Sequence, residues 1–192
     1  FEVPKDWQDN ISIDPGLKNP LSAHWYAVDF DGNVYVVAEH YKAGEDIDYH
    51  ARRIHEISSA LGWKQDASGR VRALIDSAAG QRTLASQKSV SELFYERGIL
   101  VDARVNKELF SGIARVKSYL KRGNGQPDLF IFSCCTHLIR ELKGYFWGKG
   151  DNPEKKDDHA LDELRYYLMN RPHHTEEKTM SDVQREKERL LR

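Results

Sequence analysis

The chain has 192 residues, of which 40% are hydrophobic and 31% charged, and its formal net charge is -1 at pH 7. This length suits one α/β domain with a tail and is short for two full domains. The balanced charge excludes a protein that is basic overall, so any surface for nucleic acid must be local. No apolar run approaches the roughly 20 residues of a membrane span. The only cysteines, Cys134 and Cys135, are adjacent, which predicts reduced thiols rather than a structural disulfide.

The hydrophobic pattern predicts a run of strands followed by alternating helices and strands. Short apolar or β-branched segments, bounded by Gly, Pro or Asp, predict strands over residues 11–14, 22–30, 34–41, 71–76, 99–103 and 129–132. Apolar residues at helical spacing predict helices over residues 46–61, 89–97, 107–120, 136–142 and 158–169. In the third helix, Leu109, Ile113, Val116 and Leu120 are expected on one buried face.

The order of these elements predicts an α/β fold of the RNase H-like type. Asp31-Gly32 is a hairpin signal, so the first three strands should form an antiparallel meander. The later strands should join it in parallel, giving a mixed sheet with helices on both faces. Residues 1–10 are expected to be a linker, residues 11–171 the domain, and residues 172–192 a polar tail that forms a loose helix or stays disordered.

Three aspartates occupy positions at which this topology brings side chains together. Asp14 ends the first strand, Asp76 ends the fourth, and Asp162 lies on the last helix. If the first and fourth strands are parallel neighbours, the first two carboxylates lie side by side, and they repel unless a cation or proton joins them. Carboxylate oxygens favour Mg²⁺ or Mn²⁺. With the third acid, they predict a pair of metal sites suited to phosphodiester hydrolysis.

The last helix offers two further candidate metal ligands. Asp158 and His159 lie four and three residues before Asp162, so all three project from one surface. Leu161, Leu164 and Leu168 take the opposite, apolar side. Asp157 is expected to cap the helix. A surface histidine and solvated acids are the alternative interpretation of this pattern.

The end of the domain resembles a known family. Residues 157–167 read Asp-Asp-His-Ala-Leu-Asp-Glu-Leu-Arg-Tyr-Tyr, and residues 138–147 read Leu-Ile-Arg-Glu-Leu-Lys-Gly-Tyr-Phe-Trp. Together they resemble the closing signature of phage terminase large subunits, in which an ATPase motor precedes a C-terminal nuclease that cuts concatemeric viral DNA. The resemblance extends over about residues 11–171.

The resemblance implies a function, a site and partners. It makes Asp14, Asp76 and Asp162 the catalytic acids that bind two Mg²⁺ or Mn²⁺ ions, with His159 and Asp158 nearby. It implies double-stranded DNA as substrate, in the host bacterial cytoplasm, and residues 1–10 as the linker from an ATPase domain. The full-length protein would also contact the small terminase subunit and the portal, while the isolated domain would be monomeric. No membrane partner is expected.

Other functions remain open at this point. The sequence contains no Gly-rich phosphate loop with Lys and Ser/Thr, so it includes no ATPase half and does not favour an actin-like nucleotide fold. Ile13-Asp-Pro-Gly16 is also shared by Holliday-junction resolvases of the same fold, although these usually offer Glu where Asp76 stands. A non-catalytic module that binds DNA or a partner is the third alternative.

A local basic surface for DNA is expected after the fifth strand. Sequence-independent phosphate contacts require clustered cations. The candidate residues are Arg104, Lys107, Arg115, Lys117, Lys121 and Arg122, with a weaker patch at Arg82 and Lys88. A solvated helix face is the alternative. The aromatic residues Tyr145, Phe146 and Trp147 are expected to pack in the core, because a nuclease acting on duplex DNA has no unstacked base to hold.

Overall fold

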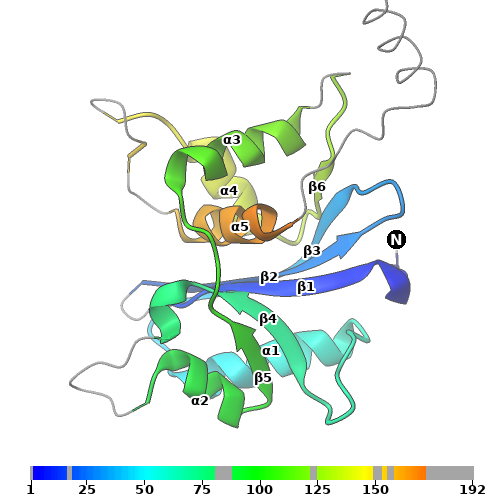
Figure 1. Cartoon of the computed structure of the whole chain (residues 1–192), viewed down its shortest axis with the longest axis vertical. Coiled ribbons are helices and arrows are strands. Elements are labelled where there is room, and N and C mark those ends of the chain that lie inside the picture. The colour runs from blue at the N-terminus through cyan, green and yellow to red at the C-terminus, as the bar shows by residue number, and fades with distance from the viewer. Residues whose placement is uncertain are drawn as a thin grey trace, which may run out of the picture.

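A computed structural model describes residues 2–16, 19–80, 88–121, 125–148, 153–154 and 158–171. One six-stranded sheet with the order β5-β4-β1-β2-β3-β6 forms its centre (Figure 1). The antiparallel meander is confirmed: β1 (Gln8–Asp14) pairs with β2 (Leu21–Val28), which pairs with β3 (Val34–Lys42). The remaining strands join in parallel: β4 (Val71–Ile75) beside β1, β5 (Ile99–Asp102) beside β4, and β6 (Leu129–Ile131) beside β3.

Helices cover both faces of the sheet, as the pattern predicts. Figure 1 shows α1 (Ile47–Ala60) and α2 (Val90–Glu96) on one face. The other face carries α3 (Leu109–Leu120), α4 (Thr136–Gly144) and α5 (His159–Asn170). Two short 3-10 turns, Lys5–Trp7 and Ser77–Gly80, precede β1 and follow β4. No helix within the described ranges is long and apolar enough to cross a membrane.

The two faces of the sheet have separate hydrophobic cores, because successive side chains of a strand point to opposite faces. Trp25 of β2 lies in the core beneath α1 and α2, together with Ile54. Its neighbour Tyr26 lies in the core beneath α5, where its ring stacks on Tyr167 with centroids 3.6 Å apart. Both faces of β1 and β2 are therefore covered, and α5 is held directly against the central strands.

The structure corrects two details of the sequence analysis. First, β1 begins at Gln8, three residues before the predicted start of the first strand. The Gln8 side chain accepts a hydrogen bond from the Lys64 amide and donates to the Gly62 carbonyl. Second, Leu120 is 43% exposed, whereas Tyr119 is buried. Positions three and four residues after Val116 both approach the buried face, and the larger ring of Tyr119 takes the contact with the core.

Candidate metal centre

The three predicted aspartates meet at one end of the sheet. Ile13 of β1 lies opposite Ile75 of β4, and the Asp76 amide donates to the Ile13 carbonyl over 3.3 Å. Asp14 and Asp76 therefore leave neighbouring strands at the same edge, as predicted for parallel neighbours. Asp162 reaches this edge from the first turn of α5. Burial raises the pKa of Asp14 and of Asp162, and the cluster's own negative charges add to both shifts: Asp76 raises the pKa of Asp14, and Asp14 raises the pKa of Asp162.

Asp14 is held by a histidine. Its side chain is 15% exposed, and Oδ2 lies 3.0 Å from Nδ1 of His159, the first residue of α5. Burial raises the pKa of Asp14, the charges of Asp76 and Asp158 add to the rise, and His159 opposes it. In return, the hydrogen bond to Asp14 raises the pKa of His159. The structure thus places His159 beside the acid cluster, as its spacing predicts.

Asp76 has three hydrogen-bond donors around its carboxylate. Oδ1 accepts from Lys107 Nζ at 2.8 Å and from the Ala78 amide at 2.7 Å, and Oδ2 accepts from the Tyr166 hydroxyl at 3.1 Å. Burial acts to raise the pKa of Asp76, but the hydrogen bonds from Lys107 and Ala78 outweigh it and the pKa lies below its usual value. The pKa of Asp76 is thus shifted in the opposite direction from the pKa values of Asp14 and Asp162.

Asp162 pairs with a cation of its own helix, Arg165 Nη2. Burial raises the pKa of Asp162, repulsion from Asp158 and Asp14 adds to the rise, and Arg165 opposes it. The Arg165 side chain is only 7% exposed and passes beneath Gly112 of α3, where an added Cβ would lie 3.2 Å from Arg165 Cδ. Its Nε and Nη1 groups are buried without a hydrogen-bond partner among the described residues.

The start of α5 is capped from another helix. The N-cap residue Asp158 makes no side-chain capping bond. Instead, Oε2 of Glu141 in α4 accepts from the Ala160 and Leu161 amides at 2.8 and 3.1 Å, which satisfies donors that a helix N-terminus leaves open. Asp157, the expected cap, lies outside the described residues. The sequence pattern around α5 does not indicate that Glu141 caps this helix, because Glu141 lies in another helix, 20 residues before Leu161.

A cleft of about 510 Å³ lies beside Asp76, Asp158 and Asp162. It is lined by Asp76, Lys107, Leu109, Tyr145, Pro153, Asp158, Asp162, Arg165 and Tyr166. Its carboxylate oxygens are the donors that Mg²⁺ and Mn²⁺ prefer. Within the described ranges, however, no three acidic, His or Cys side chains converge closely enough to hold a metal ion. Each aspartate is instead paired with a side chain of its own: Asp14 with His159, Asp76 with Lys107 and Asp162 with Arg165. The donor chemistry fits a divalent metal, and side-chain cations offset the acids.

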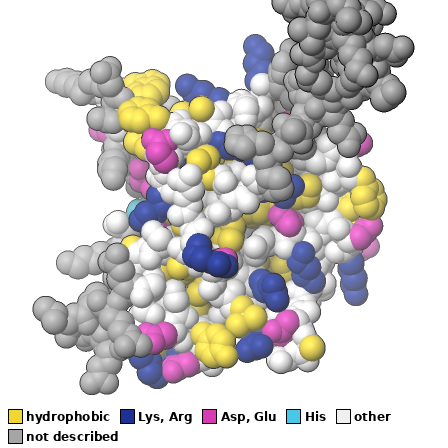
Figure 2. All heavy atoms as spheres, viewed as in Figure 1, with side chains coloured by type: hydrophobic (Ala, Val, Ile, Leu, Met, Phe, Trp, Pro, Cys, Tyr) yellow, Lys and Arg dark blue, Asp and Glu magenta, His cyan; other side chains and the backbone are white. Residues whose placement is uncertain are grey.

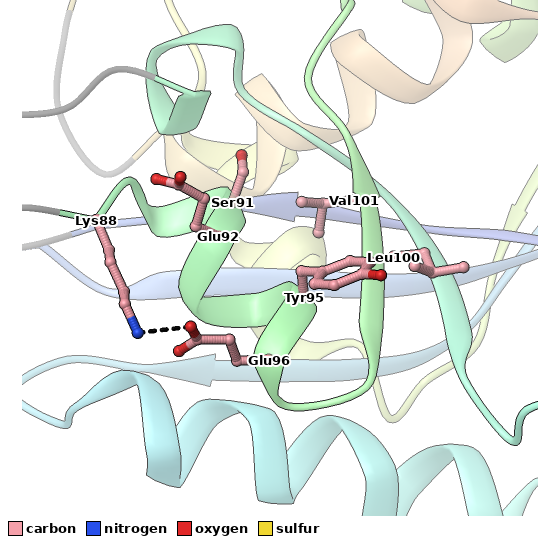
Figure 3. A pocket seen from close by; sticks show the side chains of 7 residues that line it. All are labelled: Lys88, Ser91, Glu92, Tyr95, Glu96, Leu100 and Val101. Atoms are coloured by element: carbon pink, nitrogen blue, oxygen red, sulfur yellow. Dashed lines mark hydrogen bonds and ion pairs between the residues drawn. The ribbon is translucent and has the colours of Figure 1, made fainter.

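A second groove, of about 370 Å³, lies between α2 and β5 and is chemically different (Figure 3). Glu96 points to Lys88, with which it forms an ion pair at 2.5 Å. Glu92 belongs to the capping box of α2, where its carboxylate accepts from the Ser89 amide and hydroxyl. Both acids of this groove thus have local structural roles, and the cleft at the end of β1 and β4 remains the candidate site.

The predicted basic residues do not form one uniform face. Arg104 pairs with Asp102 at 2.7 Å, and Lys107 belongs to the acid cluster. Arg115 donates to the carbonyls of Leu168 and Arg171, at 3.2 and 3.1 Å, and so supports the end of α5. Figure 2 shows Lys and Arg side chains interspersed with Asp and Glu over the face in view.

The other predicted DNA contacts have different settings. Lys117 lies over the ring of Trp147, with Nζ 5.8 Å from the ring centroid, and Lys121 is exposed at the end of α3. Lys88 is paired with Glu96 in the second groove. Arg82 and Arg122 lie outside the described residues. The DNA-contact residues therefore stay a prediction, with Lys107, Lys117 and Lys121 in the most suitable places.

Comparison with known proteins shows that solved structures share this fold. No family model matches the chain, and no curated protein does. Among solved structures, the P22 large terminase nuclease domain has a TM-score of 0.68 at 18% identity, covering 88% of this chain and 84% of that one. The g2p (large terminase) nuclease domain of bacteriophage SPP1, solved with bound Mn, has a TM-score of 0.53 at 20% identity, covering 82% and 84%.

A longer protein shares the same fold over part of its length. The large terminase of the thermophilic bacteriophage D6E has a TM-score of 0.66 at 20% identity, and the match covers 86% of this chain but only 39% of that one. The chain thus spans about two fifths of the length of this relative. At these identities the likeness establishes architecture. The mixed six-stranded sheet with helices on both faces is the RNase H-like fold of the nuclease domains of phage large terminases.

Proposed function

We propose that this chain is the divalent-metal-dependent endonuclease domain of a phage large terminase, which cuts concatemeric double-stranded viral DNA during genome packaging. The observation that carries the proposal is the meeting of Asp14, Asp76 and Asp162 at one end of β1, β4 and α5. Three acids from separate elements, with raised pKa values for two of them, are the arrangement expected where a cation is to bind. A related nuclease domain was solved with bound Mn.

In this proposal, Asp14, Asp76 and Asp162 hold two Mg²⁺ or Mn²⁺ ions, with Asp158 and His159 beside them. When bound, such ions stabilise the charge that develops on the attacking and leaving oxygens of a phosphodiester. The chain's own residues do the rest. The Tyr166 hydroxyl orients Asp76, and His159 orients Asp14. Lys107, which donates to Asp76 and lines the cleft, would supply a cation for the DNA phosphate.

The rest of the biological setting is proposed on the same likeness. The D6E large terminase is much longer than the matching region, which leaves room for an ATPase domain in a longer protein of this kind. Such a protein would act in the host bacterial cytoplasm with the small terminase subunit and the portal. We propose that the nuclease domain alone is monomeric.

The test is cleavage of supercoiled plasmid by the purified chain. We expect nicking and linearisation with Mn²⁺ or Mg²⁺, little turnover with Ca²⁺, whose looser geometry suits this chemistry poorly, and none with EDTA. Cleavage in EDTA would exclude a metal mechanism. A protein that binds DNA without cutting it under any metal would be a non-catalytic module. Strong preference for a four-way junction over linear duplex would identify a resolvase instead.

A further inference from the structure

Two aromatic side chains lie exposed near the cleft, and one of them, Trp147, contradicts the expectation that it packs in the core. Trp147 is 50% exposed and Phe110 of α3 is 50% exposed. Their rings are nearly parallel, at 13°, with centroids 6.5 Å apart. Phe146 is also exposed, at 58%. A pair of large, half-exposed rings in mutual contact is unusual on a surface that has no partner.

The pair is held in place by its surroundings. Phe110 and Lys117 lie seven residues apart in α3 and so share one face of the helix. Lys117 lies over the Trp147 ring, with Nζ 5.8 Å from the centroid. Trp147 also forms an isolated antiparallel bridge with Pro153. We call Phe110, Trp147 and Lys117 the aromatic platform.

The aromatic platform borders the acid cleft. Leu109, which precedes Phe110, lines that cleft. Tyr145 and Pro153, which flank Trp147 in the chain and in the bridge, line it as well. The rings and the Lys117 ammonium therefore lie where they would contact a polymer that leaves the cleft on this side with a phosphate among Asp76, Lys107 and Asp162.

We propose that the aromatic platform stacks an unpaired nucleobase of the DNA strand that enters the acid cleft, a proposal that rests on the function proposed above. Aromatic rings stack on any base, whatever its identity, but a paired base inside a duplex offers no free face. The Lys117 ammonium suits the adjoining phosphate. Within the double-stranded substrate proposed above, the preferred sites are thus those with unpaired nucleotides next to the cut, such as a frayed, gapped or locally opened duplex. An apolar partner protein would not need a cation at the ring.

The test is binding of the whole chain, in EDTA so that no cutting occurs, to two oligonucleotides of equal length. One is a complete duplex, and the other has a short gap that carries 2-aminopurine, a base whose fluorescence is quenched by stacking. We expect the gapped DNA to bind more tightly and its fluorescence to fall on binding. Trp147→Ala and Phe110→Ala should each weaken gapped-DNA binding about 5- to 150-fold, the range that one lost stack accounts for, and relieve the quenching. Trp147→Phe should retain most of both.

A control variant distinguishes the loss of base stacking from the effect of removing any exposed aromatic ring. Phe30, 84% exposed in the turn between β2 and β3, is replaced by Ala and should change nothing. Equal binding of gapped and complete duplex, or Trp147→Ala binding like the parent chain, overturns the proposal. So does self-association that Trp147→Ala abolishes without any change in DNA binding. Because this assay needs no cleavage, a chain that stacks the base but never cuts plasmid refutes only the nuclease function.

Discussion

Asp162 and Glu163 are neighbours in α5, yet they lie in opposite environments. Asp162 is 29% exposed, faces the cleft and pairs with Arg165. Glu163 is fully buried against the sheet, where Oε2 accepts from the Tyr26 hydroxyl at 2.9 Å and lies 2.7 Å from His24 Nδ1. His24 Nε2 in turn lies 3.0 Å from Oε2 of Glu39. One turn of one helix thus carries a cleft acid and an interior acid.

Glu163 belongs to a network of buried charged side chains with His24 and Glu39, in which its Oε1 atom is buried without a hydrogen-bond partner among the described residues. Glu39 also accepts from the His137 and Leu138 amides, which ties β3 to the start of α4. Burial acts to lower the pKa of His24, but Glu163 and Glu39 outweigh it and raise the pKa to about 9. These same bonds lower the pKa of Glu39 to about 2, although burial opposes them.

The two acids have different roles: Glu163 supports the structure, and Asp162 belongs to the proposed functional site. Buried charges are tolerated when the fold supplies fixed partners, and removing one partner is costly. Asp76 and Asp162 instead line a cavity, where they are paired with Lys107 and Arg165, and a bound metal ion would replace these side-chain cations in the proposed function. Charge in the interior therefore positions α5, and charge in the cleft is available for chemistry.

The largest expected effect is loss of cleavage in Asp162→Asn. This change removes a negative charge that the proposed metals need, so plasmid nicking should fall by more than about 100-fold, beyond the range typical of residues that only support a ligand. Stability should change little or rise slightly, because repulsion from Asp158 and Asp14 disappears. Asp14→Asn and Asp76→Asn should behave alike. Nicking at the parent rate by any of the three would remove that residue from the site.

Glu163→Gln should lower stability more than it lowers cleavage, the reverse of Asp162→Asn. The substitution leaves His24 charged and buried with one partner fewer, which should lower the free energy of unfolding by about 3 kcal/mol. Urea denaturation at neutral pH measures this loss, with Asp162→Asn as the matched control on the next residue. If the two variants are equally stable, the interior network does not hold α5.

The interior network also predicts how stability depends on pH. The folded pKa of His24, about 9, lies above the ordinary value of 6.5, so its contribution is complete below about pH 6.5 and is lost as pH rises through 9. A shift of this size corresponds to about 3 kcal/mol. Denaturation midpoints measured from pH 6 to 10 should fall accordingly. In His24→Asn, this alkaline slope should flatten; an unchanged slope would assign it to other groups.

The smallest expected effect comes from Gly112→Ala. The added methyl group crowds the Arg165 side chain, which pairs with Asp162. The new Cβ would lie 3.2 Å from Arg165 Cδ, and this buried side chain has little room to move. The strain, about 1–3 kcal/mol, exceeds the gain in helix propensity of about 1 kcal/mol, so stability should fall by about 1 kcal/mol and nicking by a few-fold. Gly144→Ala is the control, since nothing lies within 4 Å of its added Cβ. Equal behaviour of both variants would show that Arg165 does not depend on this space.

Some features of the fold and site follow from local patterns. The alternation of strands and helices and the hairpin at Asp31-Gly32 can be predicted, because each depends on side-chain periodicity or turn chemistry within a few residues. The parallel pairing of β1 with β4 joins distant residues, such as Ile11 and Ala73, and is expected from the order of the elements. The approach of Asp14, Asp76 and Asp162 follows from that topology. Such inferences need only the order of the elements and the residue at the end of each.

The sequence by itself determined which carboxylates lie at one end of the sheet, but only the tertiary structure decided what surrounds them. Glu141 caps α5 from another helix, Lys107 crosses to Asp76, and Trp147 packs on Phe110 at the surface instead of in the core. These contacts join residues that are 19, 31 and 37 positions apart, and no periodicity connects them. Their geometry depends on how α3, α4 and α5 pack together on the sheet, and that packing is a property of the whole domain.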